Sequence, residues 1–388
     1  AVFAAASVGD TIEVSPGVYD EDINVSGKTL QIVGLGETPG AVSIDASPGL
    51  PAIRVQGGAS LTLRNVRVTG ADVTGFGGGI DVVDAALLLE DAVIEGNAAG
   101  NAAGIVAQES VVTIRRTLVA DNSGGPSSGT AYFLNSTTLI EDSLFQGNDG
   151  NIGVSGGQIT IRRVRIWDTT LPENFAVLTP VLDADVEVSN SVIDGNTGSS
   201  FVSNFGASVQ LVNVTVANND FSVARLSDGP GEVALVNSIV TGDPALPMNE
   251  SGPLIASYSL VPGGGVSGPG IVEAAPIWKP LSFFELDAGS PGIDAADSSV
   301  VSADPDFLSQ PRFVDDGNIA DSGTGPLAYL DMGAIERRTT IRYVDDSATG
   351  TGDGLGWDNA MTDLQDAFDA AAAGVAEEIW VAAGVYRP

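Results

Sequence analysis

The sequence LTLRNVRVTG (Leu61–Gly70) decides the fold, because the chain repeats its pattern seven more times. Successive copies begin 21 to 27 residues apart, and most intervals are close to 25 residues. A repeat of this length with alternating apolar side chains is typical of a β-solenoid. The other copies are LLLEDAVIEG (87–96), VTIRRTLVAD (112–121), TLIEDSLFQG (138–147), ITIRRVRIWD (159–168), VEVSNSVIDG (186–195), VQLVNVTVAN (209–218) and VALVNSIVTG (233–242).

The columns of the repeat predict the cross-section of one coil. The first and third positions are apolar in nearly every copy, which indicates a strand with one buried face, and the apolar eighth position belongs to a second strand. The fifth position is Asn or Asp in six copies, and these residues tolerate the left-handed conformation of a tight bend. A fainter third strand precedes the first, as in AIRV (52–55), GIDV (79–82), GIVA (104–107) and AYFL (131–134). We therefore predict an all-β chain folded as a right-handed parallel β-helix, with three short strands in each coil of about 25 residues.

Charged residues at the fourth position alternate in sign along the repeats: Arg64, Glu90, Arg115, Glu141, Arg162. The fifth position reads Asn65, Asp91, Arg116, Asp142, Arg163. Neighbouring coils lie about 4.8 Å apart, so these residues form vertical columns. They could bind a sugar acid through their arginines, or they could form ion pairs between coils, each worth about 0.2–1 kcal/mol. The strict alternation favours ion pairs.

Composition excludes several classes of function. The 388 residues include 50 acidic and 16 basic side chains, for a net charge of −34, which disfavours nucleic acids and anionic membranes as partners. There is no Cys and no His, so disulfides, thiol catalysis and histidine general bases are excluded. We find no apolar run long enough to span a membrane.

The chain divides into three predicted parts. Residues 1–244 form the parallel β-helix, and residues 245–340 form an irregular closing region that covers its end. Residues 341–388 contain a linker, a cap helix and the first strand of a following β-helix unit. In this last part EEIWVAAGVY (377–386) repeats DTIEVSPGVY (10–19) after 367 residues. The chain is therefore either one segment of a tandem array or a subunit that associates head to tail with itself.

Three groups of motifs resemble those of known families. GDTIEVSPGVYDEDI (9–23) resembles the opening coil of bacterial right-handed β-helix proteins, including pectin-lyase-like solenoids. The coil ends IEGN (94–97), FQGN (145–148) and IDGN (193–196) resemble repeats of chlamydial polymorphic outer-membrane adhesins, although only FQGN carries their full FxxN motif. SPGIDA (290–295), VDDGN (314–318) and LDMGAIE (330–336) resemble, in this order, the closing region of large bacterial surface proteins. These resemblances imply an extracellular or cell-surface location.

The sequence predicts no catalytic residue. Pectin-lyase-like enzymes use a Gly-His-Gly element, a vRxPxxR-type element or a DPH element, and none of them occurs here. Asp304-Pro305-Asp306 lacks the His of the third element. We therefore predict a structural and adhesive extracellular rod or filament. The alternative is a polysaccharide lyase or hydrolase, or a carbohydrate-binding module, of the pectin-lyase-like fold, for which an extracellular polysaccharide would be the partner.

Two acidic, glycine-containing turns, DDGNIADSG (315–323) and DDSATGTGDG (345–354), could bind calcium through oxygen ligands. Neither segment has the spacing of an EF-hand loop, so solvated turn carboxylates are the alternative interpretation. The candidate ligands are Asp315, Asp316, Asn318, Asp321, Asp345 and Asp353.

Overall fold

The computed structural model describes residues 6–124, 129–171, 176–226, 231–242, 254–280, 282–301, 304–372, 376 and 378–386. The chain divides into two compact units, which are described separately. The first comprises Ala1–Phe313 and Ile319–Glu336, and the second comprises Val314–Asn318 and Arg337–Pro388.

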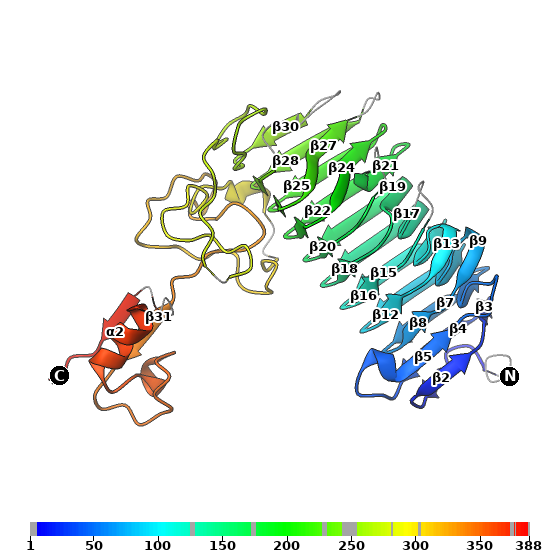
Figure 1. The fold of residues 1–388 in the computed structure, drawn as a ribbon, viewed down its shortest axis with the longest axis horizontal. Helices are drawn as coiled ribbons and strands as arrows, with labels where there is room; N and C mark the ends of the chain where they lie inside the picture. Colours follow the sequence, from blue (N-terminus) through cyan, green and yellow to red (C-terminus); the bar gives the residue numbers. More distant parts are fainter. Residues whose placement is uncertain are drawn as a thin grey trace. The chain divides into compact units, whose positions relative to one another are not determined.

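The first unit is a parallel β-helix whose coils stack strand upon strand (Figure 1). Three strands form one coil, as in β10, β11 and β12, which confirms the predicted cross-section. One wall of the solenoid is a ten-stranded parallel sheet, called here the short-strand sheet. Its strands are β2 (Gly17–Asp20), β5 (Val42–Asp45), β8 (Arg67–Thr69), β12 (Val93–Glu95), β16 (Leu118–Ala120), β18 (Leu144–Gln146), β20 (Arg165–Trp167), β23 (Val192–Asp194), β26 (Thr215–Ala217) and β29 (Ile239–Val240).

The other two strands of each coil join in one 18-stranded sheet, because β17 and β19 run without a break through the corner at which other coils turn. A separate two-stranded sheet pairs β9 (Asp72–Phe76) with β13 (Ala98–Asn101). The large sheet contains β1 (Thr11–Val14), β3 (Ile23–Ser26), β4 (Thr29–Gly34), β6 (Ile53–Gln56), β7 (Ser60–Arg64), β10 (Ile80–Val83), β11 (Ala86–Glu90), β14 (Ile105–Gln108), β15 (Val111–Arg115), β17 (Ala131–Glu141), β19 (Ile152–Arg162), β21 (Ala176–Val181), β22 (Asp185–Ser189), β24 (Thr197–Asn204), β25 (Ser208–Val212), β27 (Asp220–Leu226), β28 (Glu232–Val236) and β30 (Leu254–Ser257).

The register of the coils follows the columns of the sequence. Leu63 pairs with Leu89, which pairs with Ile114, and all three side chains are buried in the main core. The bend between β7 and β8 places Asn65 at a φ of 54°, in the left-handed region, as predicted for its column. Two arginines, Arg116 and Arg163, adopt the same conformation at φ of 45° and 53°. A long side chain is less favoured there than Asn or Asp, so both sites need compensating contacts.

A ladder of buried asparagines runs up another corner of the solenoid. The Asn97 side-chain amide donates to Asn122 Oδ1 (3.0 Å), and the Asn122 amide donates to Asn148 Oδ1 (3.1 Å). Asn196 and Asn219 continue the column, but Thr169 occupies the intervening coil. These amides bind backbone groups that the bend leaves without strand partners, for example Ile94 O (2.9 Å from Asn122 Nδ2).

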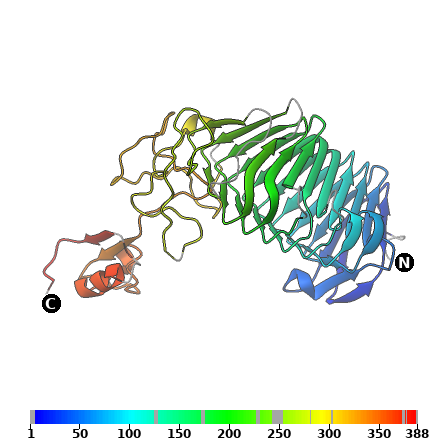
Figure 2. The same cartoon turned by 45° about the horizontal axis from the view of Figure 1, so that its top comes forward.

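The closing region, which begins after β30, is irregular and contains the short 3₁₀ turn η2 (Ser298–Val300); a second such turn, η1 (Pro39–Ala41), lies near the start of the unit. This region folds back onto the last coils, which Figure 2 shows beside it. Ala334 N donates to Thr215 Oγ1 (2.9 Å), and Gly333 N donates to Asn237 O (2.7 Å). As a result, the outward face of β23, β26 and β29 is buried, whereas the same face of β16 and β18 stays partly exposed.

Buried charges hold the closing region together. Arg312 is 2% exposed and donates to the backbone oxygens of Asp331 and Gly333. The carboxylate of Asp306, which is fully buried, accepts from Leu308 N and Gln310 N, both at 2.9 Å. These contacts fix a chain segment that has no regular secondary structure.

The second unit contains β31 (Ile341–Val344), the 3₁₀ turn η3 (Trp357–Asn359), α2 (Leu364–Ala372) and β32 (Glu378–Val381). β31 and β32 pair in parallel with α2 between them in sequence. Throughout the described parts of the chain, no helix has the length and apolarity needed to cross a membrane.

Candidate functional site

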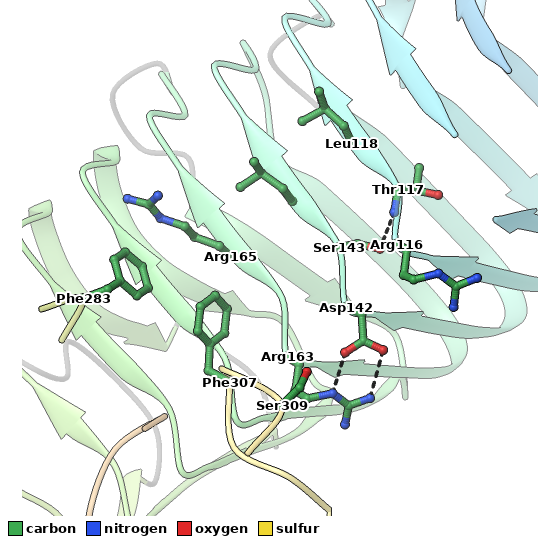
Figure 3. Close-up of a pocket in the computed structure, with 11 residues that line it drawn as sticks. Arg116, Thr117, Leu118, Asp142, Ser143, Arg163, Arg165, Phe283, Phe307 and Ser309 are labelled. Atoms are coloured by element: carbon green, nitrogen blue, oxygen red, sulfur yellow. Dashed lines mark hydrogen bonds and ion pairs between the residues drawn. The ribbon is translucent and has the colours of Figure 1, made fainter. Parts of the chain in front are cut away.

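A cleft of about 620 Å³ lies in the first unit, where the closing region ends against the open part of the short-strand sheet. Its volume falls within the range of small-molecule sites, about 300–1,000 Å³. We call it the boundary cleft, and Figure 3 shows its lining. The lining residues are Arg116, Thr117, Leu118, Asp142, Ser143, Leu144, Arg163, Arg165, Phe283, Phe307 and Ser309.

The floor of the boundary cleft is an apolar strip on the outward face of the sheet. Leu118 on β16 pairs with Leu144 on β18, which pairs with Arg165 on β20 and then Val192 on β23. Val192 is covered by the closing region, where it packs with Ala334 and Ile335. Leu118 and Leu144 are only half-buried, so the strip remains open to a ligand for two coils.

Two phenylalanine rings from the closing region form one wall of the cleft. Phe283 and Phe307 lie with their ring centroids 5.5 Å apart. The Arg165 guanidinium lies 4.6 Å from the centroid of Phe283 and 4.5 Å from that of Trp167, so it is held between two rings. It also donates two hydrogen bonds to Asp194, at 2.8 and 2.7 Å. Arg165 therefore fixes the position of Phe283 rather than offering a free charge.

The opposite rim is the predicted ladder of alternating charges, which the structure confirms as ion pairs between coils. Arg116 binds Asp91 at 2.7 Å and Glu90 at 2.5 Å, and its guanidinium holds the pKa of both carboxyls below their ordinary values. Arg163 binds Asp142 at 2.6 Å, which raises the pKa of the arginine. The other pairs among the described ladder residues are Arg64–Glu90, Arg115–Glu141, Arg162–Glu141 and Arg163–Glu141.

Among the described residues, the ladder pairs the charged groups on this rim of the boundary cleft. Asp142 is the carboxylate among the cleft residues described, and Arg163 binds both of its oxygens (Figure 3). Asp91, on the adjoining coil, is bound by Arg116. The cleft therefore presents aromatic rings and paired charges on its walls.

The six candidate calcium ligands are divided between the two units. Asp321 is exposed in the first unit, and the other five residues belong to the second. Asp345 accepts hydrogen bonds from Ser347, and Asp353 accepts them from Leu355 N and Thr351, which lowers the pKa of each carboxyl. Asp316 forms an ion pair with Arg337, and Asn318 donates to Glu378. Within the described residues of the second unit, no three acidic groups come close enough to share an ion. Calcium binding stays a prediction.

Sequence reasoning did not identify the wall of the boundary cleft. Phe283, Phe307 and Ser309 lie in the closing region, which carries no repeat that could assign them to a face. The available signal was the cluster of aromatic residues at 283, 284 and 307 in a chain that is only 6% aromatic.

Comparison with known proteins supports the fold. A family model described as "Right handed beta helix region" matches residues 51–240. The crystal structure of pectate lyase Pel9A is similar with a TM-score of 0.50 and 14% identity, over 87% of this chain and 90% of that chain. No curated protein sequence matches the chain. The protein therefore has the right-handed parallel β-helix fold.

Proposed function

We propose that this protein is an extracellular polysaccharide-binding β-helix and that its boundary cleft receives a segment of a neutral sugar chain. The observation that carries the proposal is the pairing of Phe283 and Phe307 with the open strip of Leu118 and Leu144. Rings and aliphatic side chains contact the C–H faces of a sugar, while the charged rim supplies hydrogen-bond donors and acceptors for hydroxyl groups. The structural similarity to a pectate lyase is consistent with a carbohydrate ligand.

The charge of the protein argues for a neutral ligand. The chain carries a net charge of −34, which repels a polyanion such as a polyuronate. The arginines at the cleft cannot offset this repulsion, because Arg116, Arg163 and Arg165 are each bound to a carboxylate within the protein.

Binding without cleavage is the expected activity. The carboxylate on the described walls of the boundary cleft, Asp142, is held by Arg163, and the chain has no histidine to act as a general base.

Affinity electrophoresis in gels that contain xylan, glucomannan, galactan or polygalacturonate tests this function. We expect retardation by at least one neutral polymer and none by polygalacturonate, with no new reducing ends and no unsaturated products. Phe307→Ala should remove the retardation, whereas Leu308→Ala should not, since Leu308 is 44% exposed and does not line the cleft. Equal retardation of the two variants, or cleavage of any polymer, would contradict the proposal.

A second candidate function is a rod built from β-helix units joined end to end. The specific observation is a tyrosine contact that occurs in both units. The Tyr19 hydroxyl donates to Ser15 O (2.8 Å), and the Tyr386 hydroxyl donates to Ala382 O (3.1 Å), so both partners recur after 367 residues. The second unit thus folds the start of the repeat as the first unit does. Electron microscopy of a chain with two full repeats should show rods about twice as long as those of a single repeat, and compact particles would contradict this candidate.

A further inference from the structure

Three aromatic rings lie next to one another on one face of the second unit. Tyr343 on β31 pairs with Trp380 on β32, and their ring centroids are 5.8 Å apart. On the other side of β31, the turn η3 places Trp357 with its ring centroid 4.9 Å from that of Tyr343. Trp357 and Trp380 are 45% and 48% exposed, so each keeps about half of its surface open to a ligand. We call these three residues the ring row.

Hydrogen bonds hold the ring row in place without a ligand. The Trp380 indole N–H donates to Glu378 Oε2 (2.7 Å), and the Asn318 amide donates to the other carboxylate oxygen of Glu378. These bonds hold the pKa of Glu378 below its ordinary value, so an ionised carboxylate lies beside the rings. Within η3, Ala360 N donates to Trp357 O (3.4 Å). A ligand would therefore meet rings that are already ordered, which lowers the entropic cost of binding.

The ring row lies on the face of β32 that corresponds to the outside of the solenoid. Strand β32 repeats β1 after 367 residues, so Trp380 corresponds to Glu13 and Val381 to Val14. In the first unit Val14 packs against the main core, whereas Glu13 is exposed even though β4 pairs with β1 beside it. A strand that paired beside β32 would in the same way extend the sheet and leave Trp380 open.

The charges around the rings favour a cationic ligand. Glu378 is ionised beside Trp380, and the exposed Asp358 directly follows Trp357. The face of a tryptophan ring attracts an ammonium group more strongly than that of any other side chain, and the net charge of −34 draws cations to the protein. The rings and the carboxylates therefore act in the same direction.

The shape of the ring row favours a single sugar chain over a peptide or a crystal surface. The Tyr343 ring is inclined at 68° to Trp357 and at 69° to Trp380, so the row offers no flat platform. A peptide could not add to β31 as a further strand, because both edges of β31 are paired. One edge binds β32, and at the other Tyr343 N donates to Gly354 O (3.0 Å) and Met361 N donates to Tyr343 O (2.8 Å).

We infer that the ring row binds a polysaccharide of amino sugars. The C–H faces of the sugars stack on Trp357 and Trp380, and their ammonium groups approach the carboxylate of Glu378. This inference shares with the proposed function the premise that the ligand is an extracellular polysaccharide, but it uses no residue of the boundary cleft.

Isothermal titration calorimetry of the full chain tests this site with three probes: a glucosamine hexamer, an N-acetylglucosamine hexamer and a lysine hexamer. At a pH of about 5.5 Glu378 is ionised, because its pKa lies below the ordinary value for Glu. We expect the glucosamine hexamer to bind at least tenfold more tightly than either of the others. Equal binding of the lysine hexamer would show attraction by charge alone, and equal binding of the acetylated hexamer would show that the ammonium group is not read. Either result would overturn the inference.

Variants that keep the charge of the protein locate the site. Trp357→Ala and Trp380→Ala should each weaken binding of the glucosamine hexamer at least tenfold. The matched control is Phe368→Ala, since Phe368 is a 52% exposed aromatic residue on α2 outside the ring row, and it should bind as the unchanged protein does. Equal affinities of the tryptophan variants and the control would overturn the inference.

Glu378→Gln tests the site without removing a ring, because the Gln side chain keeps an oxygen that can accept from Trp380. It should lower the preference for the glucosamine hexamer over the acetylated hexamer at least threefold, and an unchanged preference would overturn the role of the carboxylate. Retardation by a neutral polymer without binding of the glucosamine hexamer would overturn this inference alone. The opposite result would overturn the function proposed for the boundary cleft and leave the ring row as the sugar-binding site.

Discussion

Replacing Asn122 with alanine should destabilise the solenoid more than any single surface change. The side chain is fully buried and bonds to both neighbouring coils. It donates to Ile94 O (2.9 Å) and Asn148 Oδ1 (3.1 Å), and it accepts from Asn97 N (3.2 Å) and Asn97 Nδ2 (3.0 Å). Asn122→Ala leaves at least two buried backbone groups, Asn97 N–H and Ile94 C=O, without these bonds. Each such group costs about 1–3 kcal/mol, so we expect a loss of about 2–6 kcal/mol in the free energy of unfolding.

Guanidinium denaturation followed by circular dichroism measures this loss. The midpoint should fall while the slope stays unchanged, because the same surface is exposed on unfolding. Asn24→Ala is the matched control: Asn24 is an exposed asparagine on β3, and its loss should change stability by no more than about 0.5 kcal/mol. If Asn122→Ala costs less than about 1 kcal/mol at constant slope, the argument from buried backbone groups is wrong.

Two further predictions concern the corners and the ladder of charges. Thr169→Asn should raise the midpoint of guanidinium unfolding and increase the free energy of unfolding by about 1 kcal/mol. The new side-chain amide would bridge Asn148 and Asn196, which lie on either side of Thr169 in the asparagine column. An unchanged or lower midpoint would contradict this prediction. Arg116→Gln should lower stability most at neutral pH. Arg116 depresses the folded pKa of Glu90 and Asp91, so the stability that it supplies is present above their unfolded values, about 4, and is lost as the pH falls through the folded values. Thermal melts of both proteins from about pH 7 to pH 2 should therefore converge in acid, and a constant difference would refute the assigned pairing.

The repeating part of the chain could be predicted from sequence because every coil faces the same physical problem. An apolar residue at the column of Leu63 must face the interior in each coil, so the columns fix both the strands and their register. The ladder of alternating charges could be predicted for the same reason, because residues at one position of the repeat stack above one another in successive coils. Arg116 and Arg163 in the left-handed corner agree with the predicted position but not with the residue preference there.

The boundary cleft could not be predicted because one of its sides comes from the repeating part of the chain and the other from a part without a repeat. The floor residues belong to the repeat, whereas Phe283 and Phe307 belong to the closing region, whose contacts do not recur from coil to coil. Ala334 N meets Thr215 Oγ1 across 119 residues, and no periodicity links these two positions. The buried Arg312 similarly takes its partners from the closing region itself. Such docking depends on shape and on single hydrogen bonds, which a hydrophobic pattern does not encode.

The closing region also determines how the solenoid would yield to force. Strands lie across the solenoid axis, so the hydrogen bonds between coils run along it and a pull along the axis loads them one coil at a time. Each coil of about 25 residues would release about 80 Å of chain as it peels away. The last coils are clasped from outside through Thr215 and Asn237, so peeling starts at the opposite end and slows when it reaches them. Under such a force the protein would unfold coil by coil from its first coil, and its last coils would resist longest.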